Sequence, residues 1–281
     1  MSVDIEKKIV RLLEKNENVV LATIVSHSGS APRTSGSKML IRYDGSIFGT
    51  IGGGLLEAAA MEAATGLFES GGTRIISFDL SDRSSAKGID MICGGNVQVR
   101  LELVETTASN LKLMRERTKQ LEKEKKTLFM FGAGHVSQQL AILAKMVDFR
   151  VVVLDDRSQF ANRDRFEDAD EIMALSDFKY AFLNIKTGPG SYVVIVTRGH
   201  FYDEIVLKQA LRTRAGYIGM IGSRKKRDAI YASLRKKGFA ETDMNRVHSP
   251  VGIEIKAETP QEIAVSIVGE MIAHRAKNRI G

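Results

Sequence analysis

The stretch TLFMFGAGHVS (residues 127–137) decides the fold of this chain. Residues 128–131 are apolar without alternation, which predicts a strand covered on both faces of a parallel sheet. Gly132 then permits a sharp turn, and Gly134 removes the Cβ that would hold a pyrophosphate away from the N–H groups opening the next helix. A second apolar strand ends in the acidic run VVVLDDR (residues 151–157). This order predicts the first half of a Rossmann-like dinucleotide fold.

Two further side chains bear on this prediction. Asp155 lies 21 residues after Gly134, where a carboxylate can bond a ribose hydroxyl and disfavour a 2′-phosphate. Ser137 stands where the fingerprint has Gly or Ala, so helix and strand are expected to lie slightly further apart. The simpler alternative is a tight glycine turn in a sheet that binds nothing. The flanking strands favour the fold, whereas dinucleotide binding itself stays open.

Length and composition bound the class of protein. A chain of 281 residues with 43% hydrophobic and 27% charged residues predicts a globular protein of two domains. Its 41 basic and 34 acidic residues give a net charge of +7, which favours anionic ligands without demonstrating nucleic-acid binding. The sequence shows no apolar run long enough to span a bilayer and no signal-peptide core, so we expect a cytoplasmic protein that does not enter a membrane.

The pattern of strands and helices divides the chain into two domains and a connector. Residues 1–106 predict a smaller α+β domain with antiparallel or mixed strands. Residues 107–126 are polar and charge-rich and end in EKEKK, which indicates a helical connector. Residues 127–281 alternate strand and helix, which predicts an α/β domain with a Rossmann-like, doubly wound parallel sheet.

A second glycine cluster, in the first domain, repeats the physics of the first. Gly52, Gly53 and Gly54 open an Ala-rich helix in GTIGGGLLEA. Such a cluster exposes backbone N–H groups that suit a phosphate, a carboxylate or an oxyanion. For an isolated Gly-Gly-Gly, a turn packed closely on a neighbouring strand is the simpler interpretation.

The second domain is expected to hold its ligand at the carboxyl ends of its strands. Four strand ends carry GAGH, DDR, TRGH and IGS, which should converge on one crevice. His135 would border the phosphate turn, and Arg198 and His200 would border the crevice. The histidines lack a metal-ligand spacing such as His-x-x-x-His, so we expect no metal site built by the protein.

Two groups with chemical potential lie in loops of the first domain. Cys93 is the single cysteine, which excludes an internal disulfide and a cysteine-cluster metal site. A thiol beside two glycines is accessible and could be a nucleophile, a persulfide carrier or a soft-metal contact, although free cysteines more often serve packing. Arg33 could hold an anion through two hydrogen bonds, although a solvated loop is the default.

The run SRKKRDAIYASLRKKG (residues 223–238) places seven cationic side chains on one predicted helix. Tyr231 is its only aromatic residue. A solvated helix face is therefore favoured over a nucleic-acid surface.

Taken together, the motifs of this chain resemble the XdhC/CoxI family, the xanthine dehydrogenase accessory factors. They keep their order over nearly the whole chain: SGSAPRTSGSKML, GTIGGGLLEA, ICGGNVQV, FGAGHVSQQLA, VVLDDR, VVIVTRGH, YIGMIGSRKK and SPVGIEIKAETPQEIAVSIVGEMIA. The resemblance implies a maturation factor that binds the molybdenum cofactor, as molybdopterin or its cytosine dinucleotide form. Such a factor protects the cofactor while a cysteine desulfurase assists its sulfuration, and then passes it to the apo-enzyme of a molybdenum hydroxylase. We also expect a homodimer.

The resemblance also implies roles for particular residues. Cys93 would be the thiol nearest the metal or the transferred sulfur. Phosphate or oxo groups would be held in the first domain by Arg33, Gly52, Gly53 and Gly54. The crevice of the second domain would be lined by Gly132, Gly134, His135, Asp155, Arg198 and His200.

Three functions stay open at this point. A non-catalytic cofactor chaperone is preferred, and the absence of a cysteine set for iron–sulfur clusters argues against xanthine dehydrogenase itself. The first alternative is an NAD(H)-dependent oxidoreductase, which the glycine fingerprint favours and the lack of an evident proton donor opposes. The second is a nucleic-acid-binding or scaffold protein that uses residues 223–237.

Overall fold

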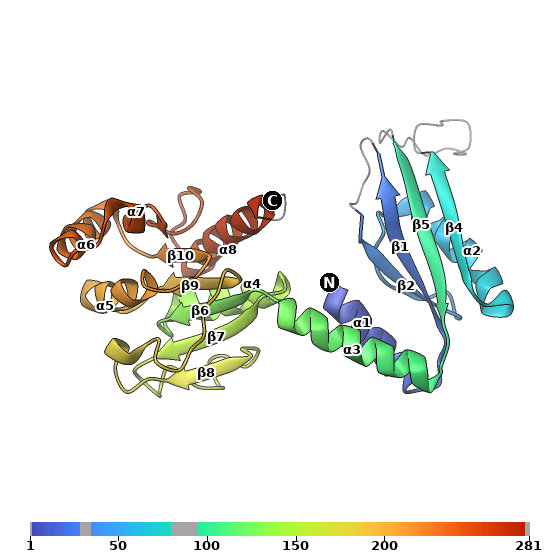
Figure 1. Cartoon of the computed structure of the whole chain (residues 1–281), viewed down its shortest axis with the longest axis horizontal. Helices are drawn as coiled ribbons and strands as arrows, with labels where there is room; N and C mark the ends of the chain where they lie inside the picture. The colour runs from blue at the N-terminus through green and yellow to red at the C-terminus, as the bar shows by residue number, and fades with distance from the viewer. Residues whose placement is uncertain (1, 29–34, 80–94, 279–281) are drawn as a thin grey trace. The chain divides into compact units, whose positions relative to one another are not determined.

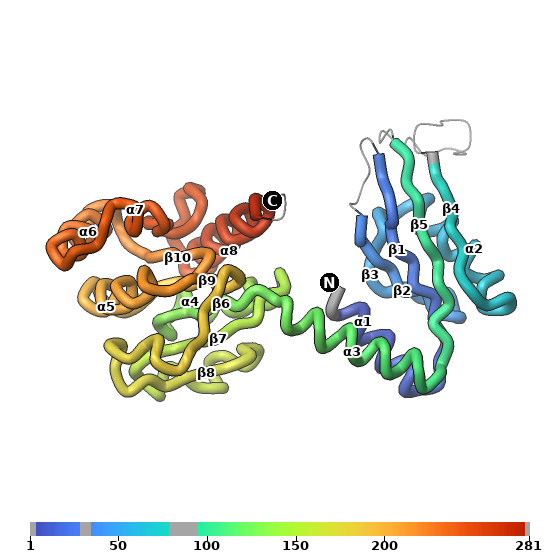
Figure 2. Tube along the Cα trace, viewed as in Figure 1, coloured from blue at the N-terminus to red at the C-terminus, as the bar shows by residue number. Residues whose placement is uncertain are grey.

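The computed structural model of the chain describes residues 2–28, 35–79 and 95–278. The chain divides into two compact units, Met1–Lys123 and Glu124–Gly281. Figure 1 labels the elements of each unit, and Figure 2 follows the chain trace through them. Each unit has its own sheet and its own hydrophobic core.

The first unit is built on a five-stranded antiparallel sheet with the order β3-β2-β1-β5-β4. Its elements are α1 (Ser2–Leu13), β1 (Val19–His27), β2 (Lys38–Arg42), β3 (Ile47–Gly49), α2 (Gly54–Ser70), β4 (Thr73–Asp79), β5 (Asn96–Val104) and α3 (Ala108–Glu124). The expected smaller α+β domain with antiparallel strands is confirmed.

Alternation along β1 explains how helices cover both faces of this sheet. Val20 and Ala22 pack in one cluster with Leu56 of α2. Val19 packs in a second cluster, together with Ile9 of α1 and Met114 of α3. Successive side chains of a strand point to opposite faces, so β1 is buried between α2 on one side and α1 with α3 on the other. The polar helix α3 therefore packs into the core of the first unit.

The second unit is a six-stranded sheet in which every pair of neighbouring strands is parallel. Its strand order is β11-β10-β9-β6-β7-β8. The strands are β6 (Thr127–Phe131), β7 (Arg150–Asp155), β8 (Glu171–Ala174), β9 (Ser191–Ile195), β10 (Tyr217–Met220) and β11 (Val247–His248). Because the chain runs outward from β6 in one direction and then from β9 in the other, the topological switch point lies between these two strands.

Helices cover both faces of this parallel sheet, which confirms the doubly wound fold. They are α4 (His135–Met146), η1 (Phe178–Tyr180), α5 (His200–Ala210), α6 (Arg224–Lys236), α7 (Glu241–Met244) and α8 (Pro260–Lys277). Leu128 and Met130 of β6 pack with α4 and α8. Phe129 and Phe131 pack with η1, α5 and α6 on the opposite face. The apolar run without alternation at residues 128–131 is thus buried on both sides.

Candidate functional site

The turn after β6 is shaped by two glycines with different roles. Gly132 has φ +114° and its N–H donates to the Leu154 carbonyl at 2.7 Å. A Cβ on Gly132 would lie 2.3 Å from the carbonyl oxygen of Val196, so only glycine fits. Gly134 is the N-cap of α4, and a Cβ there would have no atom within 4 Å. Within the described ranges no side chain caps α4, so its first N–H groups have no partner from an N-cap side chain.

Ser137 ties α4 to this turn. Its hydroxyl is fully buried and donates to the Gly132 carbonyl at 2.5 Å. The sequence predicts a slightly larger distance between helix and strand because serine replaces Gly or Ala at this position. In the structure the serine hydroxyl links α4 to the end of β6 through a hydrogen bond.

Asp155, at the end of β7, is only 1% exposed. Its Oδ2 accepts from the N–H of Ala133 at 2.8 Å, and its Oδ1 accepts from the backbone N–H and Nε of Arg157 at 3.0 and 2.9 Å. Burial acts to raise the pKa of Asp155, but the bonds from Arg157 and Ala133 outweigh it and the pKa is lowered. An ionised carboxylate therefore fastens β7 to the glycine turn.

The loop after β9 comes to the same edge of the sheet. Arg198 forms two hydrogen bonds with Asp156, one of them at 2.8 Å, and its guanidinium carbon lies 4.0 Å from the centre of the Tyr202 ring. The bond to Asp156 is the largest of the effects that raise the pKa of Arg198. The DDR and TRGH motifs are therefore joined, as the sequence predicts for strand ends on one crevice, and Arg198 is held in one place by two partners.

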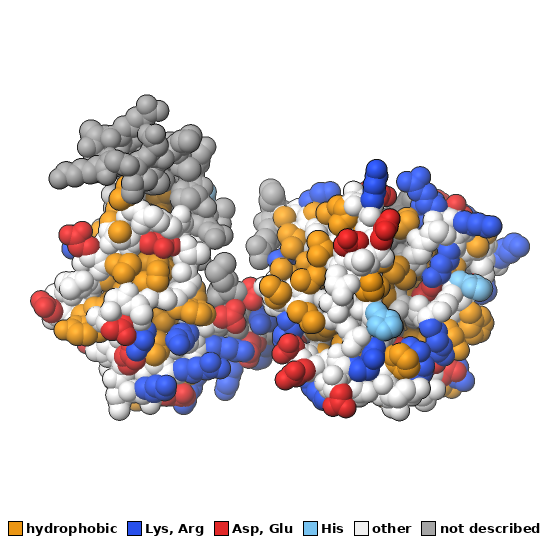
Figure 3. Space-filling view, turned by 180° about the vertical axis from the view of Figure 1, so that it is seen from behind, with side chains coloured by type: hydrophobic (Ala, Val, Ile, Leu, Met, Phe, Trp, Pro, Cys, Tyr) orange, Lys and Arg blue, Asp and Glu red, His pale blue; other side chains and the backbone are white. Residues whose placement is uncertain are grey.

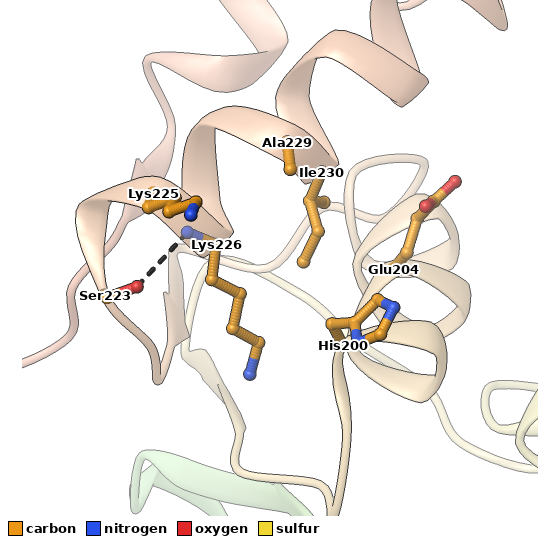
Figure 4. Close-up of a pocket in the computed structure, with 7 residues that line it drawn as sticks. All are labelled: His200, Glu204, Ser223, Lys225, Lys226, Ala229 and Ile230. Atoms are coloured by element: carbon orange, nitrogen blue, oxygen red, sulfur yellow. Dashed lines mark hydrogen bonds between the residues drawn. The ribbon is translucent and has the colours of Figure 1, made fainter.

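A cleft of about 490 Å³ opens beside this edge, between α5 and α6. Figure 4 shows His200 and Glu204 on α5, and Lys225 and Lys226 at the start of α6. Its lining consists of His200, Glu204, Ser223, Lys225, Lys226, Ala229 and Ile230. Most of these residues were missed by sequence reasoning, although a basic run directly after the strand end IGS was the available signal.

A buried carboxylate pairs with Lys226, one of the residues that line this cleft. Asp203 is fully buried and its Oδ1 accepts from the N–H and hydroxyl of Thr197 at 3.2 and 2.6 Å. Its Oδ2 pairs with the Nζ of Lys226, which also donates to the Ile221 carbonyl at 3.2 Å. Burial raises the pKa of Asp203 although Lys226 and Thr197 oppose the rise. Lys226 is thus a cation of the cleft, whereas the sequence favoured a solvated helix face for the whole basic run.

In the first unit, a carboxylate of the chain itself occupies the glycine cluster that opens α2. Glu57 Oε1 accepts from the Thr50 hydroxyl at 2.5 Å, from Gly53 N–H at 2.9 Å and from Ile51 N–H at 3.2 Å. Burial acts to raise the pKa of Glu57, but these hydrogen bonds outweigh it and the pKa is lowered. The N–H groups near Gly52 do bind an anion, and in this structure that anion is internal.

Two regions of the chain match known families. Residues 12–79 match the family described as XdhC and CoxI, and residues 128–271 match the XdhC Rossmann domain. The chain belongs to the XdhC and CoxI family. The resemblance seen in the sequence motifs is therefore confirmed, and it extends over both units.

Individual relatives agree with this membership. The uncharacterised protein YqeB of Escherichia coli is 32% identical over 93% of this XdhC-type chain, which spans only 44% of the length of YqeB. The protein PaoD of Escherichia coli, named a molybdenum cofactor insertion chaperone, is 24% identical over 95% of this chain and 86% of its own length. A crystal structure described as a xanthine dehydrogenase from Bacillus halodurans is 25% identical, covers 97% of this chain and 96% of its own, and has a TM-score of 0.85. These relatives support an accessory factor of the XdhC type.

Two predicted site residues of this XdhC-type chain, Arg33 and Cys93, lie outside the described residues. Across residues 2–28, 35–79 and 95–278, His, Cys, Asp and Glu side chains do not gather into a group that could hold a metal ion. Within the same ranges, none of the helices combines the length and apolar character that a bilayer crossing requires.

Proposed function

We propose that this chain binds the molybdenum cofactor and delivers it to the apo-enzyme of a molybdenum hydroxylase. The observation that carries this proposal is the start of α4, where the described residues supply no side-chain cap and a Cβ on Gly134 would meet no atom within 4 Å. A helix start of this kind favours phosphate, which the cofactor carries in both its molybdopterin and its cytosine dinucleotide form. Family membership and the name of PaoD support the choice of this ligand.

The residues of the second unit fit an anionic ligand. Gly134 and His135 would hold phosphate at the turn that Gly132 shapes, and Arg198 and His200 would face the rest of the ligand. Asp155 would act as a positioning residue, because its carboxylate holds Ala133 and Arg157. The cofactor supplies the metal and its sulfur ligand when bound. The protein's part is to hold the phosphate end and to keep water from the reactive end.

In the first unit, Gly52, Gly53, Gly54 and Arg33 would bind an oxo or phosphate group. Glu57 accepts from Gly53 N–H and Thr50, so an oxo or phosphate group that binds there must displace the Glu57 carboxylate. Cys93 would stand nearest the sulfur that a cysteine desulfurase provides. We further propose that the protein works in the cytoplasm as a homodimer.

The direct test is to purify the protein from molybdenum-replete cells and to identify any bound pterin by mass spectrometry. We expect a molybdenum-containing pterin at a stoichiometry approaching one per chain. The same preparation is titrated with NADH, which addresses the alternative of an NAD(H)-dependent oxidoreductase. Tight binding of NADH or hydride transfer, without any pterin, would reject the chaperone.

The sulfur role of Cys93 has its own test. Cys93→Ser is expected to leave the thermal midpoint and the pterin content unchanged while it lowers activation of the client hydroxylase, because serine keeps the size but not the nucleophilic sulfur. Equal client activation by the variant and the wild type would remove the thiol from the mechanism. Cofactor content and client activity are measured separately, so that loss of binding is not mistaken for loss of sulfur transfer.

A further inference from the structure

The cleft between α5 and α6 carries a charge arrangement that folding alone does not explain. The first four residues of α6 are Arg224, Lys225, Lys226 and Arg227, and its first turn contains no acid. The start of a helix carries partial positive charge, so cations are unfavourable there and anions are favoured. A local rule broken in this way is expected at functional sites.

Two of these four cations are compensated within the protein. Lys226 pairs with buried Asp203, and Arg227 pairs with Asp228 at 2.7 Å. Within the described ranges no carboxylate pairs with Lys225, which lines the cleft, or with Arg224 beside it. Uncompensated positive charge therefore remains at the mouth of the cleft.

The other walls of the cleft add an imidazole side chain and an apolar floor. His200, the first residue of α5, lines the cleft (Figure 4), and Ala229 and Ile230 supply apolar surface. Among the described residues of the lining, Glu204 is the one carboxylate, and Lys237 and the Ser233 hydroxyl already bind it. In the view of Figure 3, Lys and Arg side chains gather near histidine on the right-hand part of the second unit, where α5 and α6 lie. The lining thus combines net positive charge with an apolar surface.

The cleft is distinct from the glycine turn. The turn opens α4, which packs on one face of the sheet, whereas α5 and α6 pack on the other. A volume of about 490 Å³ exceeds what a bare phosphate ion needs and falls within the range of pockets that hold small organic ligands. The arrangement suits a phosphate group joined to an organic part.

We propose that this cleft binds a phosphate ester, with Lys225 and His200 contacting the phosphate. Lys226 is a positioning residue, because Asp203 and the Ile221 carbonyl fix its ammonium. The identity of the ligand rests on the proposed function: the glycine turn would hold the phosphate of the cofactor, and the cleft would take the nucleotide end of its cytosine dinucleotide form. A free mononucleotide has the same chemistry and is the other source of such a ligand.

The test uses cytidine monophosphate and cytidine as probes of the full chain in isothermal titration calorimetry. We expect the monophosphate to bind at least about tenfold more tightly than cytidine, since a charge-assisted bond contributes this much. Lys225→Gln and His200→Gln should each weaken monophosphate binding about tenfold. Lys236→Gln, on the exposed last turn of the same helix, is the control and should leave the affinity unchanged.

Each further outcome decides the proposal. Equal binding of the two probes, or wild-type affinity in Lys225→Gln, overturns it. Pterin retention during purification shows whether the ligand of the cleft is the cofactor or a free mononucleotide. It also distinguishes failure of the proposed chaperone function from failure of the proposed cleft. Retention that is lost in Lys225→Gln assigns the cleft to the cofactor, whereas monophosphate binding by a chain that purifies without pterin keeps the cleft and removes the cofactor chaperone.

Discussion

Gly132 and Val196 approach so closely that a Cβ on the glycine would lie 2.3 Å from the valine carbonyl oxygen. The contact joins the glycine turn after β6 to the end of β9, across the switch point of the sheet. Two residues later, a Cβ on Gly134 would meet no atom within 4 Å. The fold therefore requires glycine at position 132, whereas at position 134 a larger residue would fit the fold and glycine would serve a ligand.

Gly132→Ala is expected to destabilise the second unit by roughly 3 kcal/mol, because alanine meets both a backbone clash and a φ of +114°. The thermal unfolding midpoint, followed by circular dichroism, checks this. Gly188→Ala is the control, since a Cβ at Gly188 meets no atom within 4 Å. Equal midpoints for Gly132→Ala and Gly188→Ala would contradict the close approach.

Gly134→Ala is expected to keep the wild-type unfolding midpoint and to lose cofactor. Its backbone, at φ −79° and ψ −169°, suits any residue, and its Cβ has room. In the proposed site that Cβ would take up space that the phosphate needs, so we expect about tenfold less pterin to copurify, as when one charge-assisted phosphate contact is lost. Gly188→Ala is again the control. A Gly134→Ala protein with full pterin content would place the phosphate elsewhere.

The parts of the fold that the sequence predicts well depend on neighbours within a few residues. Residues 128–131 and Gly132 specify a buried strand and its turn by local composition alone. The start of α8 is equally local: Thr259 caps the helix by accepting from Glu262 N–H at 3.2 Å, directly before Pro260. Such local features can be recognised in the sequence without knowledge of tertiary contacts.

The parts of the site that sequence reasoning missed depend on contacts between distant segments. Asp203 gains its role only because α6 brings Lys226 onto it, 23 positions later. The sequence allowed either a packed turn or an anion site at the glycine cluster before α2, and its N–H groups suit Glu57 as well as an external phosphate. Composition cannot distinguish an internal carboxylate from a ligand, because both satisfy the same donors.

The Asp203–Lys226 pair predicts a steep cost for removing one partner. Lys226→Met is expected to lower the free energy of unfolding by about 3 kcal/mol, because it leaves a buried carboxylate without its cation. The double variant Asp203→Asn/Lys226→Met should recover much of this loss. Thermal and chemical unfolding of the single and double variants measure the coupling.

Lys237→Met is the matched control for that cycle. Lys237 pairs with Glu204 at the surface, with 48% of its side chain exposed, so its removal should cost less than about 1 kcal/mol. Burial raises the pKa of Asp203, so in Lys226→Met the folded state binds a proton more readily than the unfolded chain. The deficit of Lys226→Met should therefore shrink as the pH falls. A deficit independent of pH would show that Asp203 is already protonated in the wild type.

Glu57→Gln tests the internal anion at the glycine cluster through its pH dependence. The hydrogen bonds from Thr50 and the N–H groups hold the pKa of Glu57 below its ordinary value of 4.5, against the effect of burial. As the pH falls, the unfolded chain takes up the proton first, so the stabilisation by ionised Glu57 is present above about pH 4.5 and is lost as the pH drops through the folded-state value. At pH 7 we expect Glu57→Gln to lower the free energy of unfolding by about 1 kcal/mol, and we expect the difference from wild type to narrow below pH 4.5.

Glu62→Gln, an exposed change on the same helix, should leave stability within about 0.5 kcal/mol at both pH values. A Glu57→Gln deficit that persists unchanged at low pH would mean that the charge of Glu57 does not contribute to holding the glycine turn.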